Sequence, residues 1–192
     1  MQLLPRELVV YVGRIREFDR ADWAVYLFWV VGMVGLGVVI AAFQLFGRAH
    51  GAVFPAEAYL VPIGVAIFAA AIAVDTIGHR TIYKEALRGG EQLVHHVIIA
   101  LGIASCVLLC LAYEHPRTYA IPAAVVTSLS FVYSLVDEAM HWRRYIKAKS
   151  DRVEMWSHVF ILTGHSIMML GWWRWFMLGY PGVAETLRAI SA

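Results

Sequence analysis

The chain has 192 residues, of which 60% are hydrophobic and only 16% are charged. Ordinary soluble domains hold about 45–50% apolar and about 25% charged residues. This composition, with a mean hydropathy of +0.65, therefore argues against a soluble single domain. The formal net charge of +2 is too small to indicate a partner by itself. We expect the lipid bilayer, and no nucleic acid, to be the main partner.

Long apolar stretches account for most of the sequence. A helix needs about 20 largely apolar residues to cross about 30 Å of hydrocarbon, and five stretches meet this requirement with short connections between them. We therefore predict an all-α integral membrane protein with a single membrane domain over residues 1–192 and five transmembrane helices. The predicted spans are 23–47, 58–79, 91–113, 118–141 and 154–177.

The first 20 residues have a different pattern, in which apolar residues recur at helical spacing among arginines. The apolar positions are Leu4, Leu8, Tyr11, Val12, Ile15 and Phe18, and the basic ones are Arg6, Arg14, Arg16 and Arg20. Helices with one apolar and one basic face lie in the plane of the membrane interface. Residues 1–20 are therefore predicted to form an interfacial amphipathic helix ahead of the first span.

The distribution of Lys and Arg predicts the orientation in the membrane. With the N-terminus in the cytoplasm, twelve of these residues fall on the cytoplasmic side and four on the other, which agrees with the positive-inside rule. Trp172, Trp173, Trp175 and Tyr180 then form an aromatic belt where the last span leaves the bilayer. We predict a protein of the cytoplasmic (inner) membrane with its N-terminus in the cytoplasm and its C-terminus outside.

Two segments of the chain, 59–113 and 119–177, resemble one another. A Tyr-x-x-Pro sequence opens both, and Val-Asp-x3-His-x3-Tyr follows in each, at Val74 and at Val136. A Glu-x3-His pair then follows in each half. We interpret the two segments as parallel repeats of a helix hairpin, which together make a four-helix bundle from the second to the fifth span.

The repeat places one carboxylate and one imidazole on each of four helices. Residues four apart lie on the same helical face, and the predicted topology brings all these groups to the cytoplasmic ends of the spans. We expect four helices to converge on one site. Its candidate metal ligands are Asp75, His79, Glu91, His95, Asp137, His141, Glu154 and His158.

Imidazole and carboxylate ligands suit a divalent metal, with iron favoured and zinc, manganese or copper left open. Helical bundles hold dinuclear centres with inward carboxylates and Glu-x-x-His pairs, although the spacing here has three intervening residues. The alternative is that these groups only pair with basic residues at the membrane interface. Two matching repeats favour the metal site, because ionisable groups near spans are costly and are usually kept for function.

Two further histidines lie near this set. His96 follows His95 and points about 100° away on a helix, so we expect it to orient a ligand or to make a helix contact. His165 lies seven residues beyond His158, about 10 Å deeper by helical rise. It either extends the site into the membrane or bonds to a serine of the neighbouring span, such as Ser130 or Ser134.

Glycines in the first span, Gly32, Gly35 and Gly37, could allow close helix packing or an oligomer contact. This span has no polar candidate ligand. The sequence also has no Gly-rich phosphate loop, nucleophile elbow or haem-attachment motif, so the histidine and carboxylate set is the main candidate for chemistry.

The clustered histidines and carboxylates resemble the membrane fatty-acid desaturases and hydroxylases, with Gln92-x-x-His95-His96 similar to one of their histidine boxes. That resemblance implies two irons at the cytoplasmic face, with carboxylates replacing some of the family's histidines. Asp-x3-His followed by a later histidine is also similar to the C subunit of particulate methane and ammonia monooxygenases. Both resemblances cover a few residues only.

These observations favour a membrane metalloprotein with a dinuclear centre, acting as a di-iron oxidoreductase of the oxygenase or hydroxylase type on a lipidic or apolar substrate. Its electrons would come from a separate redox partner on the cytoplasmic side. A divalent metal-ion transport or handling protein is the first alternative. The second is a b-type cytochrome with haem b, or an assembly subunit of a larger membrane complex or oligomer.

Overall fold

The computed structural model describes residues 4–83, 90–148 and 151–192, apart from the side chains of Leu4, Glu91, Gln92 and Ala148. The described residues form helices and no strand. They are α1 (Leu4–Gly13), the short 3-10 helix η1 (Arg14–Glu17), α2 (Arg20–Ala49), α3 (Ala56–Thr81), α4 (Glu91–Glu114), α5 (Pro116–Ala148), α6 (Arg152–Met177) and α7 (Val183–Ser191).

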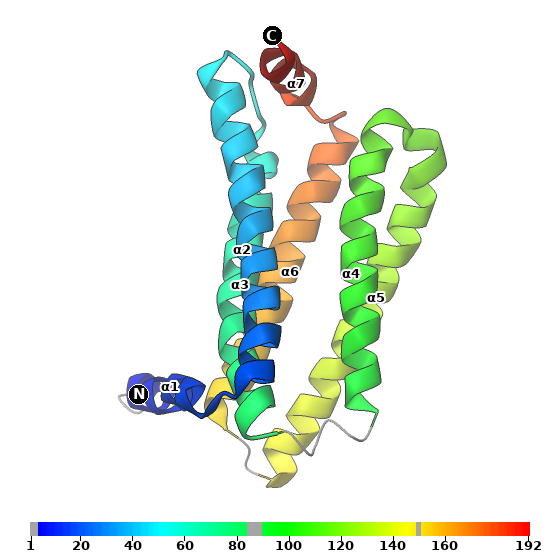
Figure 1. Ribbon diagram of the computed structural model, residues 1–192. Helices are drawn as coiled ribbons and strands as arrows, with labels where there is room; N and C mark the ends of the chain where they lie inside the picture. Colours follow the sequence, from blue (N-terminus) through cyan, green and yellow to red (C-terminus); the bar gives the residue numbers. More distant parts are fainter. Residues whose placement is uncertain (1–3, 84–89, 149–150) are drawn as a thin grey trace.

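The long helices α2, α3, α4, α5 and α6 run up and down between the two ends of the molecule (Figure 1). Among the described residues, α2, α3, α4 and α5 are long and apolar enough to cross a membrane, which is consistent with the predicted helical membrane protein. Helix α6 covers the fifth predicted span, but its apolar stretch is interrupted by His158 and His165, and it does not reach the same hydropathy. The fifth span therefore stays a prediction.

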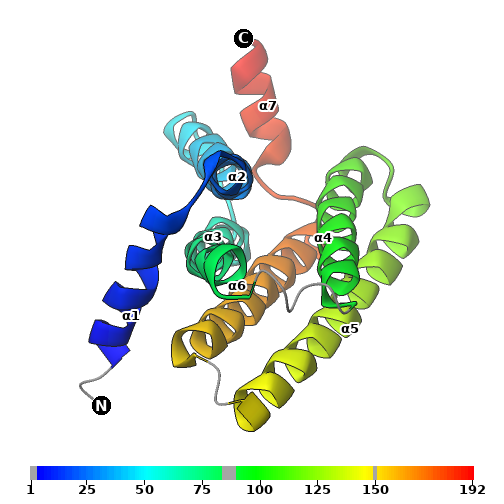
Figure 2. The same ribbon diagram turned by 60° about the horizontal axis from the view of Figure 1, so that its bottom comes forward.

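The helices pair in an order that the sequence did not indicate. Helix α3 packs most extensively on α6, and α4 packs on α5, so the largest contacts lie outside the predicted hairpins of consecutive helices. Helix α2 covers α3, and Figure 2 shows α6 between α3 and the α4–α5 pair. The two repeats of the predicted bundle likewise stay a prediction.

Glycines explain the close approach of α3 to α6. A Cβ atom added at Gly164 would lie 2.6 Å from the backbone nitrogen of Phe68 and 2.9 Å from the carbonyl oxygen of Gly64, and one at Gly64 would overlap the backbone of Met168. Of the glycines that the sequence suggested for packing, Gly37 does face α3, because a Cβ added there would lie 3.1 Å from Cγ1 of Val65. No described atom lies within 4 Å of a Cβ added at Gly32 or Gly35. Backbone contact therefore sets the α3–α6 pairing.

Helix α1 lies at one end of the bundle, beside α3 and α6, and runs in a different direction from α2 (Figures 1 and 2). Val9 and Val10 on this helix are exposed, whereas Tyr11 is buried and packs with Ile77 of α3 and Val153 of α6. This arrangement fits a helix in the membrane interface, with its buried face turned toward α3 and α6.

Helix α2 begins at a capping box that also fixes it to α3. Asp19 accepts a hydrogen bond from the backbone nitrogen of Asp22 (2.8 Å), and the Asp22 carboxylate accepts one from the backbone nitrogen of Asp19 (3.2 Å). The same Asp22 carboxylate pairs with Arg80 of α3 at 2.6 Å. One buried carboxylate therefore both starts α2 and holds it against α3.

We expect Asp22→Ala to lower the free energy of unfolding by about 1–2 kcal/mol, because it removes a cap partner and an ion pair. The Arg80 side chain is 33% exposed, so its guanidinium can turn to water and the loss stays moderate. Thermal unfolding of the detergent-solubilised protein by circular dichroism measures the effect. Unfolding at the wild-type temperature would contradict this role for Asp22.

Helix α5 extends beyond its predicted boundary, and helix α7 was not predicted. Helix α5 continues from the predicted end of its span at residue 141 to Ala148, because no Pro or Gly interrupts residues 142–148. Helix α7 follows the last predicted span and starts after Gly182, whose φ of 88° suits glycine. Its buried Thr186 donates a hydrogen bond to the Gly182 carbonyl oxygen (2.6 Å), and α7 packs on α2.

Candidate metal centre

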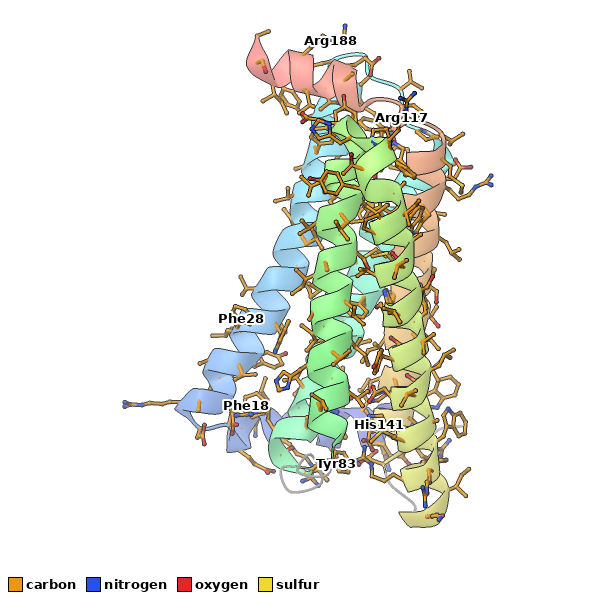
Figure 3. All side chains as sticks on the ribbon, turned by 90° about the vertical axis from the view of Figure 1, so that its right-hand side faces the viewer. Phe18, Phe28, Tyr83, Arg117, His141 and Arg188 are labelled. Atoms are coloured by element: carbon orange, nitrogen blue, oxygen red, sulfur yellow. The ribbon has the colours of Figure 1, made fainter. Side chains whose placement is uncertain are left out.

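Four histidines from four different helices meet at the end of the bundle where α1 lies. They are His79 of α3, His95 of α4, His141 of α5 and His158 of α6. The ring centroids of His141 and His158 are 3.5 Å apart, and His79 lies 5.0 Å from His95. Figure 3 shows His141 near Tyr83 at this end, with Arg117 and Arg188 at the opposite end.

Two groups of side chains offer atoms close enough together to hold a metal ion. In each group the ligand atoms lie within 4.8 Å of one another, and the groups share His141. The first is His79, His141 and His158, all buried. The second is His95, Asp137 and His141, of which His95 is partly buried and the other two are buried. The predicted convergence of the four helices therefore produces adjacent candidate metal positions.

Asp75 contacts histidines of two helices. Its Oδ2 lies 3.2 Å from Nε2 of His79, one turn along α3, and its Oδ1 lies 3.1 Å from Nε2 of His158 on α6. Ser157 of α6 donates a hydrogen bond to Asp75 Oδ1 at 3.5 Å. The carboxylate thus faces two imidazoles with its two oxygens.

Asp137 occupies the equivalent position on α5. Its Oδ1 lies 2.9 Å from Nε2 of His95 and 3.5 Å from Nε2 of His141, and its Oδ2 lies 3.8 Å from Nδ1 of His158. This carboxylate therefore links histidines from three helices. A carboxylate with each oxygen facing different imidazoles is arranged as a bridging ligand would be.

Glu154 contacts the Nδ1 atom of His141. The Glu154 side chain is 1% exposed, and its Oε1 lies 3.1 Å from Nδ1 of His141 and 3.4 Å from Nη2 of Arg144. The Nη2 atom of Arg144 also lies 2.7 Å from Nδ1 of His141. These contacts fix the imidazole so that its Nε2 faces Asp137, which is how an outer partner orients a metal-binding histidine.

Tyr83 lies just beyond the end of α3, next to Arg144 and Asp151. Its hydroxyl accepts a hydrogen bond from the backbone nitrogen of Asp151 at 3.4 Å. The guanidinium of Arg144 lies 4.9 Å from the centre of the Tyr83 ring. Burial, followed by the interaction with Glu154, raises the pKa of Tyr83 above its ordinary value, so the phenol stays protonated.

Sequence reasoning missed Glu138, Arg144 and Tyr83. Glu138 Oε1 lies 3.3 Å from Nδ1 of His158. Glu138 and Arg144 are each three residues from His141 in the sequence, which puts them near its helical face, and this spacing could have identified them. Tyr83 lies four residues beyond His79 and has a counterpart, Tyr145, in the other half of the sequence.

Several buried imidazole nitrogens have no hydrogen-bond partner of good geometry within the part of the chain that the structure describes. They are both ring nitrogens of His79 and both of His158. Buried polar atoms without a partner are costly. The surrounding carboxylates of Asp75, Asp137, Glu138 and Glu154 outnumber the positive charge of Arg144. A divalent cation would both ligate the nitrogens and balance this negative charge, so the donor set fits a metal ion.

Two of the sequence-predicted residues, His96 and His165, lie outside this cluster. The side chain of Glu91 lies outside the described residues, although its backbone begins α4. The side chain of His96 is exposed. His165 is buried and stacks on Phe131 with a centroid distance of 4.5 Å, and Ser130 Oγ lies 3.5 Å from its Nε2. The serine contact on the neighbouring helix is therefore the alternative that holds for His165.

No family model, curated protein or solved structure matches the chain. The functional argument therefore depends on the fold and on the geometry of the site. Together they define a helical membrane protein with a buried histidine and carboxylate cluster that could bind a metal ion.

Proposed function

We propose that this chain is an integral membrane metalloprotein with a dinuclear metal centre. The proposed site comprises the predicted residues Asp75, His79, Glu91, His95, Asp137, His141, Glu154 and His158, with Glu138 added. Within this set the imidazoles and Asp137 bind metal, and Glu154 orients His141. One observation carries the proposal: Asp137 has one oxygen toward His95, a member of one candidate ligand group, and the other toward His158, a member of the adjacent group.

The membrane arrangement belongs to the same proposal. Helix α6 is the fifth span, the predicted repeats supply the two halves of the site, and the cluster lies at the cytoplasmic ends of the spans. The N-terminus is then cytoplasmic and the C-terminus outside. This orientation is supported by the excess of Lys and Arg in the connections at the end where the cluster lies.

The activity that fits best is that of an oxidoreductase on a lipidic or apolar substrate, with iron as the metal. Iron held by imidazole and carboxylate, with open positions, suits oxygenase chemistry. The protein's part is to hold the metals, to exclude water with the buried ends of four helices, and to admit substrate from the bilayer. A separate cytoplasmic protein supplies electrons at the exposed basic residues near the site, such as Arg143 and Lys147.

Ion transport receives less support from the geometry. Beyond the cluster, most of the buried side chains that join α3, α5 and α6 are apolar, such as Val65, Ala123 and Met168, and the buried polar ones include Thr127 and Ser130. His165 at mid-depth packs between Phe68 and Phe131. An ion leaving the cluster would have to cross this apolar region, which is unfavourable.

The metal content of the purified protein tests the proposal. We expect about two irons per chain by elemental mass spectrometry in mild detergent, consistent with dinuclear bundle sites, and almost none in a variant carrying Asp75→Ala, His79→Ala, Asp137→Ala and His141→Ala. The matched control carries His50→Ala and His115→Ala, at the opposite end of the bundle, and should keep the wild-type content. Absence of metal from the wild type, or equal metal in all three proteins, would refute a shared metal centre.

A further inference from the structure

Tyr11 reaches the metal centre from outside the four helices that carry its ligands. The residue is 1% exposed, and its ring packs with Ile77 of α3 and Val153 of α6. Each of these neighbours lies close in sequence to a site residue, Ile77 two positions before His79 and Val153 one before Glu154. The Tyr11 ring therefore packs against the segments of α3 and α6 that carry His79 and Glu154.

Glycine at position 78 makes room for the Tyr11 hydroxyl. A Cβ atom at Gly78 would overlap the hydroxyl oxygen and lie 2.7 Å from the ring carbon that bears it. On a helix, Gly78 lies next to the face that carries Asp75. The absence of a side chain at this position thus lets the hydroxyl sit against the backbone of α3, beside the carboxylates.

The Tyr11 hydroxyl has no hydrogen-bond partner among the described residues, and the same holds for Oε2 of Glu154. One of these atoms can donate and the other can accept. Burial, then the charges of Asp75 and Glu154, raise the pKa of Tyr11 well above its ordinary value, so the phenol keeps its proton. Within the described residues, a buried donor and a buried acceptor are therefore both left without a hydrogen-bond partner.

We propose that Tyr11 donates a hydrogen bond to a water-sized ligand that binds the metal centre from the α1 side. The ligand accepts from Tyr11 and, where it carries hydrogen, donates to Glu154. This inference rests on the proposed metal centre and adds to it an open position with a defined direction. Tyr11 is then a ligand-binding residue of the site, supplied by the interfacial helix.

Azide is a suitable probe, because it is small, binds metals and accepts a hydrogen bond. The protein is loaded with cobalt(II), and the azide dissociation constant is read from the visible absorption of the cobalt. Tyr11→Phe removes only the hydroxyl, and we expect azide affinity to fall about fivefold to tenfold with unchanged cobalt content. Tyr26→Phe is the matched control, since Tyr26 packs at the edge of the same apolar cluster on α2, and it should leave azide affinity unchanged.

Thermal unfolding of the metal-free proteins separates this role from a structural one. Because the hydroxyl lacks a hydrogen-bond partner among the described residues, Tyr11→Phe should unfold at or above the wild-type temperature, and a lower temperature would overturn the inference. Equal azide affinity in Tyr11→Phe and wild type, loss of cobalt from Tyr11→Phe, or no azide binding to the loaded wild type would each overturn it too. A wild-type protein that binds no cobalt would instead contradict the proposed metal centre.

Discussion

Asp137→Ala is expected to reduce the metal content from about two ions per chain to one or fewer, with at least a tenfold loss of affinity for the remaining ion. Asp137 is the carboxylate that contacts His95, His141 and His158, which come from three helices. Its removal takes away the shared oxygens and leaves three imidazoles without their common partner. Elemental analysis and competition with a chelator of known affinity measure both effects.

Two variants sharpen this experiment. Asp137→Asn keeps the size of the side chain but loses the charge, and we expect it to lose metal as well, because a neutral amide bridges two cations poorly. Glu138→Gln is the matched control on the next residue, whose Oε1 lies 3.3 Å from Nδ1 of His158. It should keep both ions with a smaller change in affinity. Wild-type metal content in Asp137→Asn would rule out a bridging carboxylate.

The long helices could be predicted because their physical cause is local. A charge-free run of about 20 apolar residues is sufficient to indicate a span, and α2 to α5 begin and end within a few residues of the predicted boundaries, apart from the C-terminal end of α5. Helix α7 was missed because its nine residues carry no such run. It depends on the turn at Gly182 and on contact with α2.

Part of the candidate site could be predicted because the spacing of its residues along each helix is also local. Asp75 with His79 and Asp137 with His141 are four apart, so each pair shares a helical face whatever the tertiary structure is. The roles of Glu138, Arg144 and Tyr11 depend on how α1, α5 and α6 pack together, which no single helix encodes. His165 shows the same limit, since its serine partner was one of the options but its stacking on Phe131 was not anticipated.

The pairing of α3 with α6 was not predicted, because glycines are common in membrane helices and their positions alone do not indicate a partner. Gly64 and Gly164 differ from Gly32 and Gly35 only in what faces them. The consequence for the metal centre is direct. Helix α3 carries Asp75 and His79 and α6 carries Glu154 and His158, so the contact between these glycines sets the separation of half of the ligands.

Gly164→Ala should therefore destabilise the fold and weaken the metal centre together. Its new Cβ atom would lie 2.6 Å from the Phe68 nitrogen and 2.9 Å from the Gly64 oxygen, and these are backbone atoms that cannot move without displacing α3. We expect a loss of about 1–3 kcal/mol in unfolding free energy, measured by thermal unfolding in detergent. We also expect a reduced metal content, because a wider crossing separates the ligands of α3 from those of α6. The ligands on α6 lie about 9 Å along the helix from the glycine.

Gly32→Ala is the matched control for Gly164→Ala. Nothing lies within 4 Å of a Cβ atom at Gly32, and alanine favours a helix over glycine by about 1 kcal/mol, so this variant should be as stable as the wild type or more so, with full metal content. If Gly164→Ala behaved in the same way, α3 and α6 would not meet through their backbones. Gly164→Ala could also lose stability but keep both metals at wild-type affinity. In that case the geometry of the metal centre would not depend on the α3–α6 crossing, and α4 and α5 would have to hold the metals without α3 and α6.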